Sequence, residues 1–415
     1  MKHWMRNCLT ALVALALSSV CSAASPAIAN GPALSATRVY VIANEDLGYP
    51  FQNEISIFLA GGTNASPLLT LQTVVPTGGH GIAGGYFGTT RLNSVPDISA
   101  TCLYVSNAGD SDIASFSLLT QQLVGHFSGS PRDSGGANGI GLAVNQNYLY
   151  ASFTSSNTIG TFALQPGCGL TFLGNAHAIG LQGGSVTGMA VNATMLVVAY
   201  GDGSIQSFGV SGGIPVSNND RQNSAGYTGE IASTHLRPGS LPSGVDITRD
   251  GRFAIFGDIS APAVVVEVSS LQTGKLDRTT PYNVGQGVDA GAVRLSPDEN
   301  LLYIANSEGG TVMAAGFDAK TGKTTPGCRS AELKGFNYRP WFGSVVTRDP
   351  TGSGNVLYVG EFGRPADEHG PASAIGILKV TTNGTSCTLT ESANSPQLLS
   401  APGTLSVGAY PPRPF

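Results

Sequence analysis

Charged residues are scarce in this chain. Only 11% of its 415 residues are charged, and 26 acidic against 21 basic residues leave a formal net charge of −5 at pH 7. No stretch of the sequence gathers Lys and Arg into a basic patch. Proteins that bind nucleic acid need such a patch to neutralise phosphates. We therefore expect no nucleic acid among the partners of this protein.

Long hydrophobic runs are lacking too, apart from one near the N-terminus. Residues 9–20 (LTALVALALSSV) form an apolar run of 12 residues, which is too short to span a bilayer. Lys2 and Arg6 precede this run, and small residues ending at Ala23 and at Ala29 follow it, as in a secretory signal peptide. We predict that residues 1–29 are a signal peptide cleaved near residue 23 or 29. The mature protein is then secreted or periplasmic and has no membrane span.

Cysteine is rare, with six in the chain. Cys8 and Cys21 lie in the predicted signal peptide. None of the other four is spaced as CxxC, so a zinc cluster is not expected. An even number of cysteines in an exported protein favours disulfides. The four remaining cysteines allow three pairings, and they are Cys102, Cys168, Cys328 and Cys387.

The familiar catalytic signatures are absent as well. The sequence holds no GxSxG elbow, no HExxH pair and no P-loop, and nothing in it indicates haem or quinone attachment. What it has in quantity is glycine and proline, with 56 Gly and 24 Pro. So many turn-forming residues, without low-complexity tracts, predict many short strands rather than long helices.

The strongest signal is an internal repeat. An alternating apolar run, a small polar turn and a second alternating run recur seven times, with 46 to 64 residues between equivalent positions. The copies are VYVIANEDLGYPFQNEISIFL (39–59), LYVSNAGDSDIASFSL (103–118), LYASFTSSNTIGTFAL (149–164), LVVAYGDGSIQSFGV (196–210), FAIFGDISAPAVVVEV (253–268), LYIANSEGGTVMAAGF (302–317) and LYVGEFGRPADEHGPASAIGILKV (357–380).

A period near fifty residues with two visible strands is typical of a β-propeller blade. Gly-led apolar runs such as 139–147 supply a strand A before most hairpins, and runs such as 169–174 supply a strand D after them. The visible hairpin is then strands B and C. Residues 30–415 are therefore predicted to be one all-β domain, a seven-bladed β-propeller. The apolar letters of strand B, for example Tyr104 and Tyr303, are predicted to be core.

The two ends of the repeat region indicate how the ring closes. The first unit begins directly at strand B, at residue 39, with no strand A before it. The chain ends with PGTLSVGAYPP (402–412), which reads as a strand A with no strand B after it. We predict that this C-terminal strand completes the first blade and closes the ring, which removes an unpaired sheet edge.

These hairpins resemble the YVTN-repeat and lactonase-family seven-bladed propellers, which include 6-phosphogluconolactonase-like proteins and carboxymuconate cyclases. Residues 40–45 (YVIANE) match the family's strand and its Asn-Glu end, and residues 295–298 (LSPD) and 303–306 (YIAN) match a second copy. Gly291 and Ala292 stand where the family has Arg and His, and Ser307 stands where it has Glu. The resemblance implies a propeller of this type, and a lactone hydrolase or muconate-type cyclase if the protein is an enzyme.

In a propeller the B–C turns and the D–A loops share one face, around the mouth of the central channel, and such a concave mouth is the default ligand site. Polar residues gather in these segments. We predict catalytic roles for Glu45 as the family-like carboxylate, for His80 and His369 as proton carriers, and for Arg364 as a holder of a substrate carboxylate. The predicted ligand-binding residues are Asn44, Asp46, Asn107, Asp110, Asp202, Asp258, Asn306 and Glu361.

Three interpretations of these residues stay open. Asn, Asp and Gly favour turns for local backbone reasons alone. Several carboxylates and amides around one axis could instead bind Ca²⁺, the one possible cofactor. Otherwise they form an enzyme site for a lactone or an unsaturated carboxylic acid. The alternative to an enzyme is a non-catalytic binding or surface-interaction propeller. The partner is then a small molecule or another extracytoplasmic protein, and we expect a monomer.

The cysteines fit the repeat map. Cys102 opens strand B of the second unit, and the other three lie at the C–D connections of the third, sixth and seventh units. Neighbouring units suggest the pairs Cys102–Cys168 and Cys328–Cys387 among the three possible pairings.

Overall fold

The computed structural model describes the chain between residues 40 and 410, with gaps. The described residues are 40–45, 50–63, 65–81, 94–96, 101–129, 140–223, 242–259, 264–271, 273–277, 279–286, 290–306, 309–334, 345–347, 355–362, 373–383, 386–399 and 404–410. The predicted signal peptide lies outside them. In the part of the chain that is described, no helix is long and apolar enough to cross a membrane.

The described strands form seven antiparallel sheets, which we number 1 to 7 in chain order. Sheet 1 contains β1 (Tyr40–Glu45), β2 (Glu54–Thr63), β3 (Ser66–Pro76) and β30 (Thr404–Tyr410), and sheet 2 contains β4 (Ser94–Pro96), β5 (Cys102–Asn107), β6 (Asp112–Ser117) and β7 (Gln122–Phe127). Sheet 3 contains β8 (Ile140–Val144), β9 (Tyr148–Phe153), β10 (Thr158–Leu164) and β11 (Leu170–His177). Sheet 4 contains β12 (Val186–Val191), β13 (Met195–Tyr200), β14 (Ser204–Gly209), β15 (Val216–Ser217) and β16 (Gln222–Asn223).

Sheets 5 to 7 repeat this arrangement. Sheet 5 contains β17 (Pro242–Ile247), β18 (Phe253–Asp258), β19 (Val264–Ser270) and β20 (Thr279–Gly285). Sheet 6 contains β21 (Ala290–Leu295), β22 (Leu301–Asn306), β23 (Thr311–Asp318) and β24 (Lys323–Arg329). Sheet 7 contains β25 (Val345–Thr347), β26 (Val356–Phe362), β27 (Ser373–Asn383), β28 (Ser386–Glu391) and β29 (Gln397–Leu398). A short 3₁₀ helix, η1 (Pro166–Cys168), connects β10 to β11.

The repeated hairpins are the middle strands of these sheets. Tyr104, Tyr150, Tyr303 and Tyr358 are all fully buried, as the sequence predicts for strand B. Side chains in a strand alternate between its two faces, and both faces of these middle strands are covered, so most positions are buried and many of them are apolar. Two copies match the repeat least well, and their equivalent strand B residues, Val197 and Ala254, are buried in the same way.

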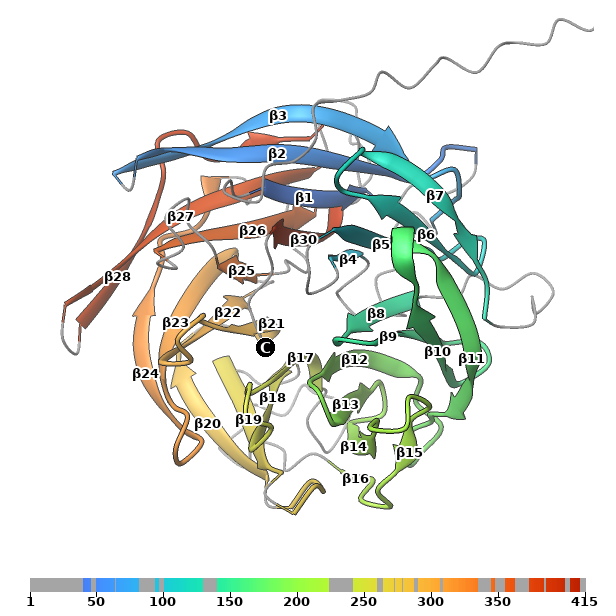
Figure 1. Ribbon diagram of the computed structural model, residues 1–415. Coiled ribbons are helices and arrows are strands. Elements are labelled where there is room, and N and C mark those ends of the chain that lie inside the picture. The colour runs from blue at the N-terminus through green and yellow to red at the C-terminus, as the bar shows by residue number, and fades with distance from the viewer. Residues whose placement is uncertain are drawn as a thin grey trace, which may run out of the picture.

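Seven apolar clusters hold neighbouring sheets together, each built from side chains of two adjacent sheets. The sheets lie side by side around a common centre, with their outermost strands at the rim (Figure 1). One of the clusters joins Val41 and Val407 of sheet 1 to Tyr358 and Ile375 of sheet 7. The core is therefore spread between the sheets, and no single sheet buries a face by itself.

The C-terminal strand belongs to the first sheet. β30 pairs with β1 in antiparallel register, with Val41 opposite Ala409 and Tyr40 opposite Tyr410. Segments more than 350 residues apart in the sequence thus share one sheet, and β1 has no unpaired edge.

Both disulfides form the predicted pairs. Cys102 bonds to Cys168, and Cys328 bonds to Cys387, each with 5.4 Å between the Cα atoms. The first joins sheet 2 to the η1 connection of sheet 3, and the second joins β24 of sheet 6 to β28 of sheet 7. The predicted positions need one correction, because Cys328 and Cys387 lie within outer strands and only Cys168 lies in a C–D connection.

Candidate functional site

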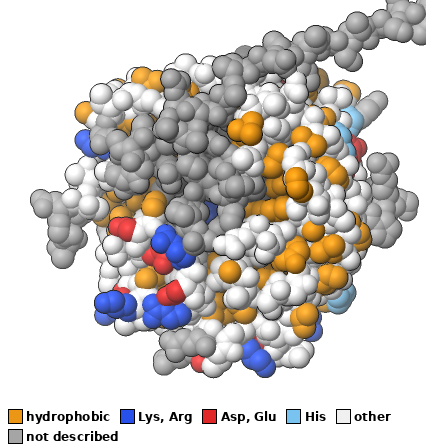
Figure 2. All heavy atoms as spheres, viewed as in Figure 1, with side chains coloured by type: hydrophobic (Ala, Val, Ile, Leu, Met, Phe, Trp, Pro, Cys, Tyr) orange, Lys and Arg blue, Asp and Glu red, His pale blue; other side chains and the backbone are white. Residues whose placement is uncertain are grey.

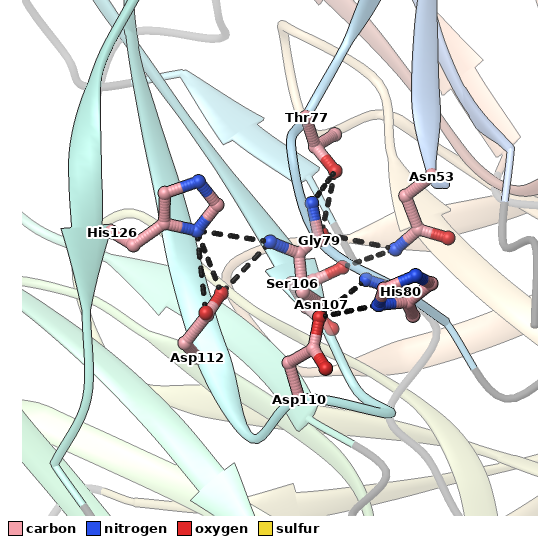
Figure 3. A network of polar contacts seen from close by, with 9 residues as sticks. All are labelled: Asn53, Thr77, Gly79, His80, Ser106, Asn107, Asp110, Asp112 and His126. Carbon is pink, nitrogen blue, oxygen red and sulfur yellow. Dashed lines mark hydrogen bonds and ion pairs between the residues drawn. The ribbon is translucent and has the colours of Figure 1, made fainter. Parts of the chain in front are cut away.

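The loop after β3 and the turn between β5 and β6 meet at one end of the strands. The backbone N–H of Gly109 donates to the carbonyl oxygen of His80 at 2.9 Å, and the N–H of Asn53 donates to the carbonyl of Gly79 at 2.8 Å. This contact brings together residues from sheets 1 and 2 (Figure 3). A D–A loop and a B–C turn therefore share one end of the molecule here, as the sequence predicts.

His80 and Asp110 form a pair at this contact. Asp110 Oδ2 accepts a hydrogen bond from the backbone N–H of His80 at 2.6 Å and lies 3.0 Å from His80 Nδ1. An ionised carboxylate only accepts, so Nδ1 carries the proton and Nε2 is the basic nitrogen of the neutral ring. The two side chains are 29% and 35% exposed. The pair is thus an oriented imidazole that solvent can reach.

Asn107 lies beneath this pair and is fully buried. Its Oδ1 accepts from Thr77 Oγ1 at 2.7 Å and from Asn53 Nδ2 at 3.1 Å, while its Nδ2 donates to Asp112 Oδ1 at 2.8 Å. A Cβ on Gly79 would come 2.3 Å from Asn107 Nδ2, so only glycine lets the loop approach this closely. Asn107 therefore positions the loop that carries His80.

A second histidine completes the network. His126 on β7 points its Nδ1 toward Asp112, 3.2 Å from each carboxylate oxygen (Figure 3). Its ring is about one third exposed, whereas Asp112 is mostly buried. Two histidine–aspartate pairs therefore flank Asn107, and the loop containing Gly78 and Gly79 runs between them.

Sequence reasoning missed several members of this network. Asn53 directly precedes β2, His126 lies on β7 and Thr77 directly follows β3, and no motif marks any of these positions. The signal that could have found them is the expected meeting of the D–A loop with the next B–C turn. That rule predicts which segments meet, but it does not predict which side chains reach across.

Asp202, in the turn between β13 and β14, has a structural environment. It accepts hydrogen bonds from Ser204 Oγ at 2.6 Å and from the backbone N–H groups of Gln182, Gly184 and Ser204. Burial disfavours the charged form, but these hydrogen bonds outweigh it and lower the pKa of Asp202. The carboxylate thus joins the loop between sheets 3 and 4 to the turn between β13 and β14.

Three other predicted ligand residues are buried where a strand B ends. Asp258, Asn306 and Glu361 lie at or next to the last residue of β18, β22 and β26. Asn306 Nδ2 donates to Thr311 Oγ1 at 3.0 Å, whereas its Oδ1 has no partner among the described residues. These positions correspond to Asn107 in sheet 2, which is also buried and polar.

Glu361 has the most unusual environment of the three. Its side chain is 0% exposed, and neither carboxyl oxygen has a hydrogen-bond partner among the described residues. Burial, and then the nearby charge of Glu391, raise the pKa of Glu361 to about 8. The raised pKa therefore favours the neutral form of this carboxyl group at pH 7.

The side chains of the remaining predicted site residues lie outside the described part of the chain. Asp46, Arg364 and His369 lie outside the described residues, and so does most of the long seventh turn. Asn44 and Glu45 lie in β1, but their side chains are not described. Their catalytic and ligand-binding roles stay predictions. In the described part of the chain, no group of three or more His, Cys, Asp or Glu side chains is arranged to hold a metal ion.

Comparisons with known proteins define the fold. No protein-family model and no curated protein sequence matches the chain. Among solved structures, a "putative 6-phosphogluconolactonase" of Bacteroides fragilis matches with a TM-score of 0.63 and 15% identity, over 91% of this chain and 99% of that one. A second protein with that description, from Bacteroides uniformis, matches with a TM-score of 0.60 and 14% identity, over 90% and 99%. A protein from Lactobacillus plantarum matches with a TM-score of 0.59 and 14% identity over the same shares.

At these identities the likeness shows the fold alone. The chain is an all-β protein with the β-propeller fold of these lactonase-like structures.

Proposed function

We propose that the chain is an exported seven-bladed β-propeller that opens a lactone at the mouth of its central channel, with His80 as the general base. The seven sheets, the apolar clusters between neighbours and the pairing of β30 with β1 support a closed ring of seven blades. Two disulfides and the N-terminal sequence support export.

The observation that carries the proposal is the His80–Asp110 pair. Asp110 fixes the imidazole so that Nε2 is the nitrogen that can accept a proton, and the ring is partly exposed. A carboxylate that orients a histidine in this way is what a general base needs. In a seven-bladed propeller, the D–A loop and the B–C turn that carry this pair would lie at the channel mouth.

The reaction can be written with these groups. His80 Nε2 removes a proton from water as the water oxygen bonds to the lactone carbonyl carbon. The ring C–O bond of the tetrahedral intermediate then breaks, and the imidazolium returns its proton to the departing alkoxide. The product is a hydroxy acid, which releases one proton to neutral solvent. Asp110 stabilises the imidazolium while it exists.

Neighbours of the same fold that carry a lactonase description support lactones as the substrate class. Unsaturated carboxylic acids of the muconate class are the second possibility for an enzyme. Glu45, Arg364 and His369 stay candidates for further catalytic groups, and Asn44, Asp46, Asp258 and Asn306 for ligand contacts. Ca²⁺ stays a possible cofactor.

The alternative proposal is a propeller that binds a small molecule or a protein on this face without turnover. The environments of Asn107 and Asp202 favour it, because both side chains are used to join loops of the fold. Histidine and aspartate at the same end could then recognise a ligand by hydrogen bonds alone.

Acid release from a panel of γ- and δ-lactones and muconates tests both proposals, using protein that begins at residue 30, with and without EDTA. We expect turnover of at least one lactone, lowered about 100-fold by His80→Asn and unchanged by His177→Asn. His177 is an exposed histidine on β11 and serves as the matched control. No turnover under any condition rejects the enzyme. Turnover that survives His80→Asn rejects the assigned base, and turnover lost in EDTA identifies a metal.

A further inference from the structure

Glu361 occupies a special position between sheets 6 and 7. It lies on β26, two residues after Val359, and alternation places it on the face that packs against sheet 6 with Leu357 and Val359. Its carboxyl group lies over Gly376 of β27, where a Cβ would come 2.4 Å from Oε1. Leu333 lies beside the same point, 3.7 Å from that Cβ position. The carboxyl group is thus fully buried, beside Gly376 and near Leu333.

Neutral carboxyl groups tolerate such a place far better than carboxylates do. A buried charge without a partner costs so much free energy that the group stays protonated or the surroundings open to admit water. No described residue donates a hydrogen bond to either oxygen of Glu361. Ionisation would therefore act directly on the packing between sheets 6 and 7.

A second carboxylate stands close to Glu361. Glu391, the last residue of β28, accepts from Ser395 Oγ at 2.6 Å and from the backbone N–H of Lys334 at 2.9 Å. Lys334 also donates from Nζ to the carbonyl oxygens of Ser392 and Ser395, at 2.8 and 3.3 Å. Lys334 follows the last strand of sheet 6, so these contacts connect sheet 6 to sheet 7.

Among the described residues, no charged group of this junction gives Glu361 a counter-charge. The Lys334 ammonium is bound to carbonyl oxygens, Glu332 is exposed, and β27 presents Gly376 and Ala374 to Glu361. A carboxylate at position 361 would therefore add repulsion toward Glu391. That repulsion would strain the same contacts that connect Lys334 to sheet 7.

We propose that Glu361 makes the junction between sheets 6 and 7 sensitive to protons, so that loss of its proton loosens the packing of the two sheets. The junction is closed while Glu361 is neutral. It opens as Glu361 ionises, because the carboxylate needs water and repels Glu391. This device does not depend on the lactone reaction, and its test uses no activity.

The raised pKa of Glu361, about 8, sets the pH range. The unfolded chain loses this proton at the ordinary pKa of a glutamate, well below that value. Between the two pKa values the unfolded state binds fewer protons than the native state, so native stability falls as pH rises through this window. Above pH 8 the native junction carries the charge.

The Cys328–Cys387 disulfide reports on this junction, because it joins β24 of sheet 6 to β28 of sheet 7. The Cys102–Cys168 disulfide between sheets 2 and 3 is an internal control in the same molecule. Reduction by tris(2-carboxyethyl)phosphine, followed by alkylation and peptide mass spectrometry, gives both rates at each pH. Their ratio cancels the pH dependence of the reductant.

We expect the ratio of the Cys328–Cys387 rate to the Cys102–Cys168 rate to rise several-fold between pH 6 and pH 9. Glu361→Gln, which stays neutral, should abolish the rise, and Glu332→Gln, an exposed glutamate of the same junction, should leave it intact. A ratio that is constant, or that rises equally in Glu361→Gln, overturns the proposal.

NMR of ¹³C-carboxyl-labelled glutamate in the wild-type protein gives a second reading. A signal titrating near pH 8 supports the assignment, and titration of every glutamate below pH 6 overturns it.

Discussion

At the scale of single residues, two aspartates in corresponding turns have different roles. Asp202 accepts hydrogen bonds from Ser204 and from backbone N–H groups, so its oxygens serve the fold. Asp110 Oδ2 accepts a hydrogen bond from the backbone N–H of His80 and pairs with Nδ1 of its ring. The same residue type in the same kind of turn therefore supports structure in sheet 4 and a candidate base in sheet 2. What decides the role is the partner that the neighbouring loop supplies.

Asp202→Asn tests the structural role. The lowered pKa of Asp202 means that its charge stabilises the native state above the ordinary pKa of an aspartate, and that this contribution is lost as pH falls through the native pKa. We expect a loss of about 1 kcal/mol of unfolding free energy at pH 7, since the partly exposed site weakens each bond. Urea unfolding from pH 7 down to pH 3 should show the difference from wild type shrinking. A difference that persists at the lowest pH contradicts this assignment.

The sequence predicted the end of the strands at which residues lie better than the contacts that they make. His80 and Asp110 were both expected at the same end of the strands, and the structure brings them together. The expectation followed from the repeat, which fixes where turns and loops lie. The pairing itself depends on a close approach at Gly79, and no local pattern in the sequence encodes that. Glu361 was expected to contact a ligand. The sequence did not predict that its side chain is buried beside Gly376 of the next strand.

At the scale of elements, Asn107 connects three segments through one side chain. Asn107→Ala should lower the unfolding free energy by about 2 to 4 kcal/mol, because buried polar groups such as Thr77 Oγ1 would lose their partner. Thermal unfolding against Asn147→Ala, an exposed asparagine in the β8–β9 turn, measures this. Equal melting temperatures for the two variants would show that Asn107 does not hold the loops together.

The strands themselves were largely predictable, because alternation of apolar residues and recurrent turns are local signals. Outer strands are the exception: as in sheet 7, where β28 and β29 both pair with β27, the outer strand of sheet 4 is divided into β15 and β16. There Asp220 Oδ1 accepts from the backbone N–H of Ser207, so a side chain replaces part of the strand pairing. Apolar patterning cannot predict such a substitution, since outer strands are partly exposed and vary in sequence.

At the scale of the whole molecule, the pairing of β30 with β1 joins the last described strand to the first. Deletion of residues 404–415 should expose Val41 and the edge of β1 and lower the melting temperature by about 10 °C or more. Deletion of residues 411–415 alone, which leaves β30 complete, is the control. Differential scanning calorimetry measures both. A chain without β30 that melts like the control would contradict a closed ring.

The surface is uneven in chemistry. Hydrophobic side chains gather on the side where β7, β10 and β11 lie, and charged side chains gather on the side of β20 and β24 (Figure 2). Phe172 and Leu173 on β11 and Val124 on β7 are among the exposed apolar residues. On this face the described charged side chains are therefore more frequent near β20 and β24 than near β7, β10 and β11.

The central claim is that an aspartate-oriented histidine at one end of a propeller opens lactones. The most direct test is kcat and KM of wild type and Asp110→Asn on the best lactone substrate, measured by acid release. Asn cannot stabilise the imidazolium or hold the same tautomer, so we predict a fall in kcat of about 100-fold with little change in KM. An unchanged kcat, or a wild-type protein that opens no lactone, would contradict the claim.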